Sequence, residues 1–193
     1  MATLRDGRKQ EMRLRILDAA RRRFESSGFA ACTTQDIAEE AGVAHGSVFV
    51  HFGSRAALTE AVVEQALDQA GKALDAMEGS AGGLGPLLGA HLDALAGIEP
   101  IYGRLVVERA LLPDAVQARI ATFDAALARR LEAAARAGSG FALRQGVRPH
   151  FAFNAWMALV VYYLINRDLF APRGLVLRQR RSELVDNYLK LVA

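Results

Sequence analysis

The sequence predicts an all-α protein, and three observations favour that class. Aromatic residues, which favour strands, make up only 7% of the 193 residues, and just five prolines interrupt the chain. Hydrophobic residues account for 52% and charged residues for 23%, which suits a folded globular protein and excludes a disordered one. Apolar residues recur at helical spacing along most of the chain. We expect about nine helices, in an N-terminal three-helix domain with a helix-turn-helix and a larger C-terminal helical bundle.

The first helix is predicted by an apolar stripe within a basic segment. The stripe recurs every four residues and comprises Met12, Ile16, Ala20 and Phe24. Gly28 is placed to end this helix. The first 23 residues contain eight basic residues against three acidic ones, whereas the whole chain has a net charge of only +3. Such a segment fits either phosphate binding or a solvated helix face, and charge alone does not separate the two.

Two short helices follow and form a helix-turn-helix pattern. Thr33, with Asp36 three residues later, matches a capping box that starts the second helix. Gly42 ends that helix after about two turns, and a third short helix is expected from about Ala44 to Phe49 or Val50. A glycine between two short helices permits the sharp turn that this motif requires.

A long helix and five further helices are expected after the helix-turn-helix. Ser54 can cap a helix over 54–77, and the glycine-rich stretch 79–85 is the clearest break in the sequence. Pro100 is expected to separate two helices. The five further helices are expected at 86–97, 101–111, 114–137, 148–168 and 176–192. The predicted domains are residues 1–53 and 54–193.

Several classes of protein are excluded by what the sequence lacks. Cys32 is the single cysteine, so an internal disulfide is impossible, and the four histidines show no spacing typical of a shared metal ion. No nucleophile–base motif or phosphate-binding loop is present, so the sequence indicates neither an enzyme nor a bound cofactor. The longest apolar run, 155–165, has 11 residues, about half of what a membrane span needs. We expect a cytoplasmic protein with no metal, no cofactor and no membrane partner.

The segment from Arg15 to Leu58 resembles the DNA-binding domain of TetR-family transcriptional regulators. The resembling positions are Arg15-Ile-Leu-Asp-Ala-Ala20, Phe24, Gly28-Phe29, Thr34, Ile37-Ala38, Ala41-Gly42-Val43, Gly46, Phe49, His51-Phe52, Arg55 and Leu58. They cover about a quarter of the chain. The resemblance implies a homodimer that binds double-stranded DNA at a palindromic operator, with residues 54–193 as the dimerisation and ligand-binding domain.

Three positions depart from the pattern of that family. The family usually has Ser or Thr where this chain has Ala44, so the third helix lacks a side-chain cap, a loss of about 1 kcal/mol. It usually has Tyr where Phe49 stands and Lys where Arg55 stands. The first two departures weaken the contacts expected with DNA, whereas Arg55 keeps the positive charge.

The third helix is expected to enter the major groove of DNA, because a two-turn helix is narrow enough to do so. His45 and Ser47 are assigned to base edges, and Gly46 lets the backbone approach closely. Phe49 suits a thymine methyl group and the domain core equally. The other expected contacts are Val50 with the groove and His51 with a phosphate or a partner at the helix end.

Phosphate contacts are expected where the second helix and the long helix begin. Free N–H groups and the helix dipole favour an anion at a helix start, where Thr33, Thr34 and Gln35 lie. Thr33 is also explained as a simple cap. Arg55 opposes the dipole of the long helix, and a phosphate would offset that repulsion.

The C-terminal domain is expected to supply a dimer surface and, by the resemblance, an effector cavity. The candidate dimer residues, which also suit the core, are Trp156, Leu159, Val160, Tyr163, Leu184, Tyr188 and Leu191. The candidate effector contacts are Tyr102, Arg104, Phe123, Leu127, Phe153, Asn154, Trp156 and Met157. Arg104 also fits a local ion-pair cluster with Glu108 and Arg109. The apolar segment 151–165 favours a small hydrophobic effector.

These features predict a ligand-responsive transcriptional repressor that a small effector releases from its operator. The helix over 54–77 is expected to be the only continuous element that joins the two domains. The alternative is a helical small-molecule-binding or scaffold protein without DNA activity, since most of the chain is an apolar bundle.

Overall fold

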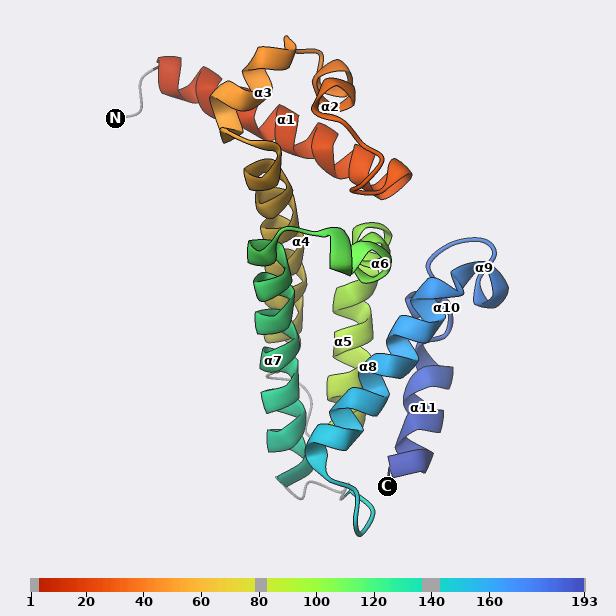
Figure 1. Cartoon of the computed structure of the whole chain (residues 1–193). Coiled ribbons are helices and arrows are strands. Elements are labelled where there is room, and N and C mark those ends of the chain that lie inside the picture. Colours follow the sequence, from red (N-terminus) through yellow and green to blue (C-terminus); the bar gives the residue numbers. More distant parts are fainter. Residues whose placement is uncertain (1–3, 79–82, 137–142, 193) are drawn as a thin grey trace.

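The computed structural model describes residues 4–78, 83–136 and 143–192, and it confirms the predicted all-α class. Over these ranges the chain forms eleven α-helices and one 3₁₀ turn, with no strand. Nine of the helices have eight or more residues, and the other two have four. Figure 1 shows α1, α2 and α3 grouped at one end of α4, whose other end belongs to a bundle with the later helices. None of the described helices is long and apolar enough to cross a membrane.

The N-terminal group consists of α1 (Leu4–Ser27), α2 (Thr34–Ala41) and α3 (His45–Phe52). All three helices contribute to one small core. Its members have no exposed surface and include Ile16, Phe24, Ile37 and Val48. A core shared by three short helices is needed here, because helices of eight residues are not stable alone in water.

The turn between α2 and α3 forms as the sequence predicts. Asp36 N donates to Thr33 Oγ1 at 3.1 Å, and Thr33 N donates to Asp36 Oδ2 at 2.8 Å, which completes the capping box. Gly42 has a φ of 64°, a left-handed conformation that glycine adopts without strain. Ala44 starts α3 without a side-chain cap, as expected for alanine.

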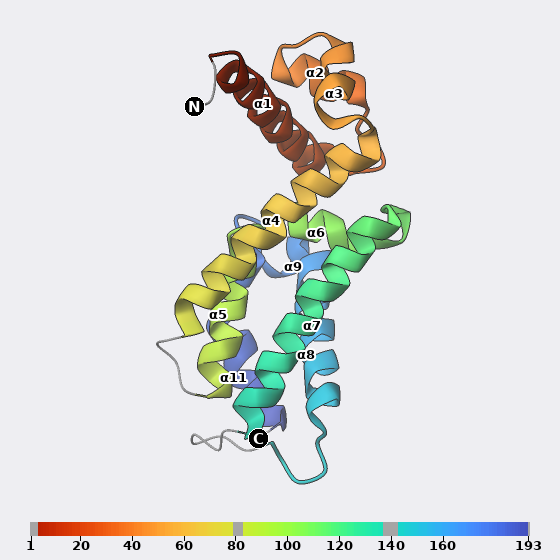
Figure 2. The ribbon, with the colours of Figure 1, turned by 90° about the vertical axis from the view of Figure 1, so that its left-hand side faces the viewer.

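The helix α4 (Arg55–Glu78) runs without a break from the N-terminal group into the bundle. Ala57 N donates to Ser54 Oγ at 3.1 Å, which confirms the predicted cap. Leu58 is fully buried near the start of α4, and Leu74 is 2% exposed farther along. Figure 2 shows α4 leaving the end of α3 and entering the bundle beside α5.

The first half of the bundle consists of α5 (Leu84–Ala96), α6 (Glu99–Glu108), a 3₁₀ turn (Arg109–Leu111) and α7 (Asp114–Arg136). The expected break between two helices is found, but it lies at residues 97–98, and Pro100 itself lies in the first turn of α6. A first turn accepts proline since its N–H groups have no partner within the helix. Within the expected break over 79–85, residues 79–82 lie outside the described ranges, and α5 begins at Leu84.

The second half of the bundle consists of α8 (Pro149–Ile165), α9 (Arg167–Phe170), α10 (Val176–Gln179) and α11 (Arg181–Val192). Two continuous helices were expected here, and each is divided. The first division falls at Asn166, which has a φ of −102° and whose side-chain amide donates to Tyr162 O at 2.9 Å. Asparagine side chains compete with helical backbone hydrogen bonds in this way.

A buried carboxylate joins α6 to α10. Glu99 is 3% exposed, and its two oxygens accept hydrogen bonds from Val176 N at 2.7 Å and Leu177 N at 3.0 Å. Burial raises the pKa of Glu99 above its usual value, whereas the two hydrogen bonds lower it. This contact caps α10 and fixes the chain that follows α8 against α6.

Candidate functional site

One face of α3 is open to solvent at the end of the molecule. Val48 and Phe52 anchor α3 in the core, with exposures of 0% and 8%. His45, Phe49 and Val50 are exposed, and Val50 reaches 77%. Phe49, which the sequence left between core and surface, is 42% exposed and lies on the surface. A short helix anchored by one face and free on the other has the dimensions to enter a major groove.

The exposed start of α3 is bonded to the start of α2. Thr34 Oγ1 and His45 Nε2 share a hydrogen bond of 2.9 Å. The His45 ring also packs edge-on against Phe49, with 5.3 Å between the ring centroids. These contacts fix the direction of the ring and occupy one of its nitrogens, so the other nitrogen is free to reach a base edge. In the same first turn Gly46 is exposed and Ser47 is half-buried.

At the start of α2, the polar side chains also have partners within the chain. Thr33 is part of the capping box, and Gln35 Nε2 donates to Glu39 Oε1 at 2.8 Å. Hydrogen bonds from Thr33 hold the pKa of the Asp36 carboxyl below its usual value, so this carboxylate is charged at neutral pH. Its negative charge competes with a phosphate for the same helix start. The geometry therefore favours the cap for Thr33, and the phosphate contacts of Thr34 and Gln35 stay predictions.

Arg55 has partners that the sequence did not predict. Its Nη2 donates to Phe29 O and, at 2.8 Å, to Cys32 O, two carbonyl groups of the loop between α1 and α2. These two carbonyl oxygens carry partial negative charge and offset the repulsion between Arg55 and the dipole of α4, a role that we had assigned to a DNA phosphate. Arg55 ties the loop to the start of α4, and because it is exposed, its contact with DNA stays a prediction.

Five arginines of α1 are likewise paired within the domain. Arg13 Nη1 donates to His51 O at 2.8 Å, and Arg15 Nη2 donates to Ala41 O at 2.7 Å. Both guanidinium groups lie at the ends of short helices, where positive charge is favourable. The other three, which form ion pairs with acidic side chains, are Arg21, Arg22 and Arg23. These five charges of the basic segment are structural, and His51, half-buried, contributes its carbonyl to that structure.

Two charged side chains of α6 hold the end of α1, and we call their hydrogen bonds the α1–α6 clasp. Arg104 Nη2 donates to Ser26 O at 2.7 Å, and Arg104 Nε donates to Glu25 O at 3.3 Å. Glu108 Oε2 accepts from Ala30 N at 2.7 Å. The clasp is a second connection between the N-terminal group and the bundle, so α4 is not the only link.

The contacts of the clasp differ from the prediction for Arg104 and explain why residue 28 is a glycine. Arg104 faces α1, and its guanidinium bonds to the carbonyl groups of Glu25 and Ser26 in place of the expected effector or the Glu108 carboxylate. Gly28 has a φ of 87°, and a Cβ atom at this position would collide with the Glu108 carboxylate. A glycine is therefore required both for the left-handed end of α1 and for the approach of α6.

A cavity of about 330 Å³ lies between α6, α7 and α8. Its lining residues are Tyr102, Leu105, Val106, Arg109, Ile120, Asp124, Phe153, Asn154, Met157 and Val161. Four of the eight predicted effector contacts are among them, namely Tyr102, Phe153, Asn154 and Met157. Sequence reasoning missed Asp124 and assigned Arg109 only to an ion-pair cluster, although Arg109 Nη1 lies 3.5 Å from Asp124 Oδ2.

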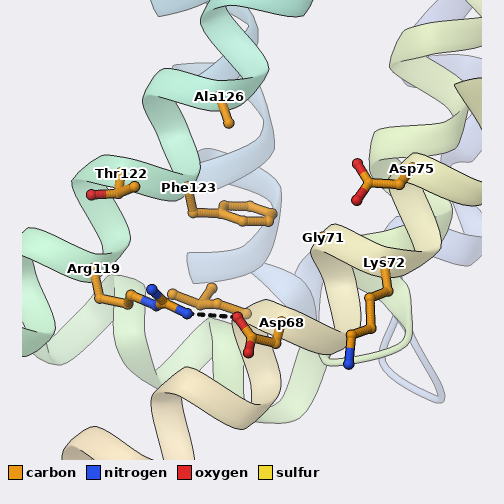
Figure 3. Close-up of a pocket in the computed structure, with 9 residues that line it drawn as sticks. Asp68, Gly71, Lys72, Asp75, Arg119, Thr122, Phe123 and Ala126 are labelled. Carbon is orange, nitrogen blue, oxygen red and sulfur yellow. Dashed lines mark hydrogen bonds and ion pairs between the residues drawn. The ribbon is translucent and has the colours of Figure 1, made fainter.

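The other predicted effector contacts lie elsewhere. Leu127 is 1% exposed and belongs to the core. Phe123 lines a separate groove of about 360 Å³ between α4 and α7. Arg119 and Asp68 form a hydrogen bond of 2.6 Å across that groove, and Figure 3 shows the Phe123 ring directed from α7 toward Gly71. Four charged side chains line this groove, namely Asp68, Lys72, Asp75 and Arg119, so it is a poor site for an apolar effector.

Trp156 belongs to the core, where it cannot meet a partner subunit directly, and it is not among the residues that line the α6–α7–α8 cavity. It is fully buried, its Nε1 donates to His91 Nδ1 at 3.1 Å, and its ring lies 5.0 Å from that of Tyr188. Burial lowers the pKa of His91 to about 3, so its ring stays neutral and accepts this bond. The indole N–H thus has the partner that a buried tryptophan needs.

The predicted dimer residues divide between core and surface. Val160, Leu184 and Tyr188 are at most 2% exposed and cannot meet a partner directly. Leu159 and Tyr163 are half-buried, and Leu191 is 69% exposed. An apolar stripe that we missed runs along α8 and into α9 at alternating spacings of four and three. It consists of Phe151, Ala155, Ala158, Tyr162, Ile165 and Leu169. That spacing is visible in the sequence, but α8 is apolar on all sides, so its outer face could not be recognised.

Comparison with known proteins places the N-terminal group in a family. Residues 16–62 match the model of the bacterial regulatory proteins, tetR family. The chain is 44% identical over 55 residues to the transcriptional regulator TtgR of Pseudomonas putida, covering 28% of this chain and 26% of that protein. It is 38% identical over 65 residues to the regulator YvkB of Bacillus subtilis (strain 168), covering 34% of each. These matches therefore span about a quarter to a third of the relatives' length.

Solved structures share the fold over nearly the whole chain. A TetR-family regulator from Agrobacterium tumefaciens has a TM-score of 0.77 at 19% identity, covering 96% of this chain and 99% of that one. The ketosteroid transcriptional regulator KstR2 of Mycobacterium tuberculosis has a TM-score of 0.72 at 19% identity, covering 94% of each chain. These proteins are named as regulators, not as enzymes. Residues 16–62 thus match the helix-turn-helix segment of the bacterial regulatory proteins, tetR family, and the chain as a whole shares the fold of these solved structures.

Proposed function

We propose that this protein is a transcriptional regulator that inserts α3 into the major groove of DNA. The observation that carries the proposal is the open face of α3, which is anchored by Val48 and Phe52 within the segment that matches the family model. Residues 1–53 are the DNA-binding domain, and residues 54–193 are the dimerisation and effector domain. The contacts with DNA come from His45, Gly46, Ser47, Phe49 and Val50, with Thr34, Gln35, His51 and Arg55 near the phosphates.

The regulator acts as a homodimer on a palindromic operator. One α3 reads too few base pairs to be selective, and a two-fold dimer places two such helices about 34 Å apart, one turn of DNA. The stripe on α8 and α9 supports this, because Phe151, Ile165 and Leu169 are 62%, 54% and 76% exposed. An apolar stripe with alternating spacings of three and four suits helix-on-helix packing between two copies of the chain.

A small effector in the α6–α7–α8 cavity releases the operator, so the protein is a repressor. The support is the position of α6, which lines the cavity with Tyr102 and Leu105 and holds α1 through Arg104 and Glu108. A shift of α6 on binding therefore changes the clasp and, with it, the placement of α3. Couplings of this kind are typically about 1–3 kcal/mol, which changes DNA affinity by roughly 5- to 150-fold.

A footprint on the DNA that flanks the protein's own gene tests the proposal, with gel-shift titration as the quantitative measurement. We expect a protected palindrome and a binding constant that falls steeply with salt, by a slope of about −0.9 per phosphate contacted. His45→Ala should lower affinity for this site by about tenfold and relax its sequence preference. The matched control is Gln65→Ala, another exposed polar residue, on α4.

A protein without any affinity for double-stranded DNA at low salt contradicts the proposal. The result would then favour a helical ligand-binding or scaffold protein, for which the cavity is the supporting observation. Equal losses for His45→Ala and Gln65→Ala would show that α3 does not read the bases.

A further inference from the structure

We propose that the α6–α7–α8 cavity takes a small, largely apolar molecule that carries a hydrogen-bond donor, a hydroxyl or an amine, directed at the carboxylate of Asp124. The effect of this molecule on operator binding rests on the proposed function, whereas its binding to the cavity does not. Three groups decide its chemistry: the Asp124 carboxylate, the Tyr102 hydroxyl and the Arg109 guanidinium.

The size and wall of the cavity limit the ligand to a small apolar molecule. The volume of about 330 Å³ is near the lower end of ligand cavities, which range from about 300 to 1,000 Å³. Most of the lining is apolar, and it comes from α6, α7 and α8 with Leu105, Ile120 and Val161 among its members. A wall of this kind favours a molecule of one ring with a short alkyl chain over a sugar or a nucleotide.

Asp124 supplies an acceptor that lacks a donor. Its Oδ2 lies 3.5 Å from Arg109 Nη1, at the limit of a hydrogen bond, and the Arg109 side chain is 47% exposed. The other oxygen, Oδ1, is buried and has no hydrogen-bond partner among the described residues. A buried carboxylate oxygen without a hydrogen-bond donor is energetically unfavourable. A ligand that donates a hydrogen bond to this oxygen removes that penalty, which favours its binding. Burial also raises the pKa of Asp124, in line with its incomplete pairing.

Tyr102 adds a second polar group to the same wall. Its side chain is 2% exposed, and no hydrogen bond of its hydroxyl is found within the described ranges. Burial and the charge of Asp124 both raise the pKa of Tyr102, so the phenol stays neutral at any physiological pH. A neutral phenol can donate to a ligand oxygen or accept from a ligand donor, and so tolerates either polar end of the molecule.

An anionic ligand does not suit the cavity. Its carboxylate would bring a second negative charge close to Asp124, whose Oδ1 is buried, and like charges repel more strongly near buried groups than in bulk water. Arg109 does not reverse this, because its positive charge already faces Asp124 and lies partly in solvent. The sequence-based expectation of a hydrophobic effector is thereby narrowed to one that carries a donor.

Calorimetric titration of the whole chain, without DNA, tests the proposal with four matched probes. They share a butylphenyl body and differ in one group: 4-butylphenol, 4-butylbenzylamine, 4-butylanisole and 4-butylbenzoate. We expect the phenol and the amine to bind at least about tenfold more tightly than the methyl ether and the benzoate, as a factor of ten is the effect of one good hydrogen bond. A tighter amine than phenol identifies charge as the stronger recognition element, and the reverse identifies the neutral hydroxyl.

Asp124→Asn should weaken the amine by at least about tenfold and remove its advantage over the ether. Asp124→Leu should equalise the phenol and the ether, since it removes the acceptor. The matched control is Asp75→Asn, which changes an exposed aspartate that pairs with Arg130 outside this cavity. The emission of the single tryptophan, Trp156, and circular dichroism verify that each variant is folded.

The proposal is overturned by equal affinity of the phenol and the ether, by strongest binding of the benzoate, or by no effect of either substitution at Asp124. The absence of binding by all four probes at millimolar concentration also overturns it. Gel shifts with and without the tightest probe are a separate measurement. If the probe binds as expected but operator affinity does not change, the ligand inference stands and the proposed release mechanism fails.

Discussion

His91 is a buried residue whose charge state links folding to pH. It is fully buried on α5 and accepts a hydrogen bond from the indole N–H of Trp156. Burial lowers the pKa of His91 from 6.5 to about 3. The pKa of His91 is therefore lower in the folded protein than in the unfolded chain. Between pH 6.5 and pH 3 the unfolded chain binds a proton at this residue, whereas the folded protein does not. The contribution of neutral His91 to the free energy of unfolding is fully present above pH 6.5, and it is lost as the pH falls toward 3.

We expect the free energy of unfolding to fall by about 2 kcal/mol between pH 7 and pH 5 because of His91 alone. His91→Gln keeps an acceptor for the indole N–H but does not titrate. Between pH 7 and pH 5, the free energy of unfolding of this variant should therefore fall by about 2 kcal/mol less than that of the wild type. Urea unfolding at both pH values, followed by the emission of Trp156, measures the difference. The same pH dependence in both proteins would mean that His91 is protonated in the folded state.

Single residues of the candidate DNA interface show where sequence reasoning stops. The exposure of His45 and Val50 agrees with their position in the motif, because an amphipathic two-turn helix has only one face to bury. The partners of Arg55 could not be predicted. Its two acceptors are backbone carbonyls 23 and 26 residues earlier in the chain. Every residue has a backbone carbonyl, so the amino-acid sequence does not indicate which of them Arg55 contacts.

At the scale of the elements, α6 joins the cavity to the N-terminal group of helices. Its residues divide between the two tasks, since Leu105 and Val106 line the cavity while Arg104 and Glu108 hold α1. A helix that is rigid over its ten residues transmits a displacement from one side to the other. The link complements α4, which is covalent but touches the cavity with none of its residues.

Removing half of the clasp should loosen the loop after α1. In Glu108→Ala, we expect the amide hydrogen of Ala30 to exchange about tenfold to a hundredfold faster, since a hydrogen bond to a charged group is worth about 1.5–3 kcal/mol. Hydrogen exchange across residues 25–32 is the measurement. The control is Val107→Ala, which truncates a neighbouring side chain that is 63% exposed. Unchanged exchange at Ala30 would show that the clasp does not restrain the domain.

The helix boundaries show a similar division between local and tertiary causes. The caps at Thr33 and Ser54 were predicted because each involves residues no more than three positions apart. The divisions of the last two expected helices were missed. The second falls at Arg180, whose guanidinium donates to Phe170 O at 2.9 Å, a contact that exists only after the chain has folded back on α8.

At the scale of the whole molecule, the outer stripe of α8 and α9 should decide the oligomeric state. Ile165→Glu places a charge within a surface that is proposed to be buried between two copies, and burying an unpaired carboxylate costs several kcal/mol. We expect a dimer for the wild type and a monomer for the variant by size-exclusion chromatography with light scattering. The monomer should also lose most of its operator affinity.

The matched control for this prediction is Ala121→Glu, which introduces the same charge at an exposed position of α7 away from the stripe. It should remain dimeric. A wild-type protein that is monomeric at micromolar concentration, or an Ile165→Glu variant that stays dimeric, would place the interface elsewhere or exclude it.

The residue pattern alone determined the helical class and the three-helix start, because each depends on residues within one or two turns of one another. Only the tertiary structure decided which apolar residues of α8 face inward, since a helix that is apolar on all sides carries no mark of orientation. For the same reason Trp156 turned out to lie in the core and Asp124 at the cavity. The partners that set their roles, His91 and Arg109, lie 65 and 15 residues away and are brought close only by packing.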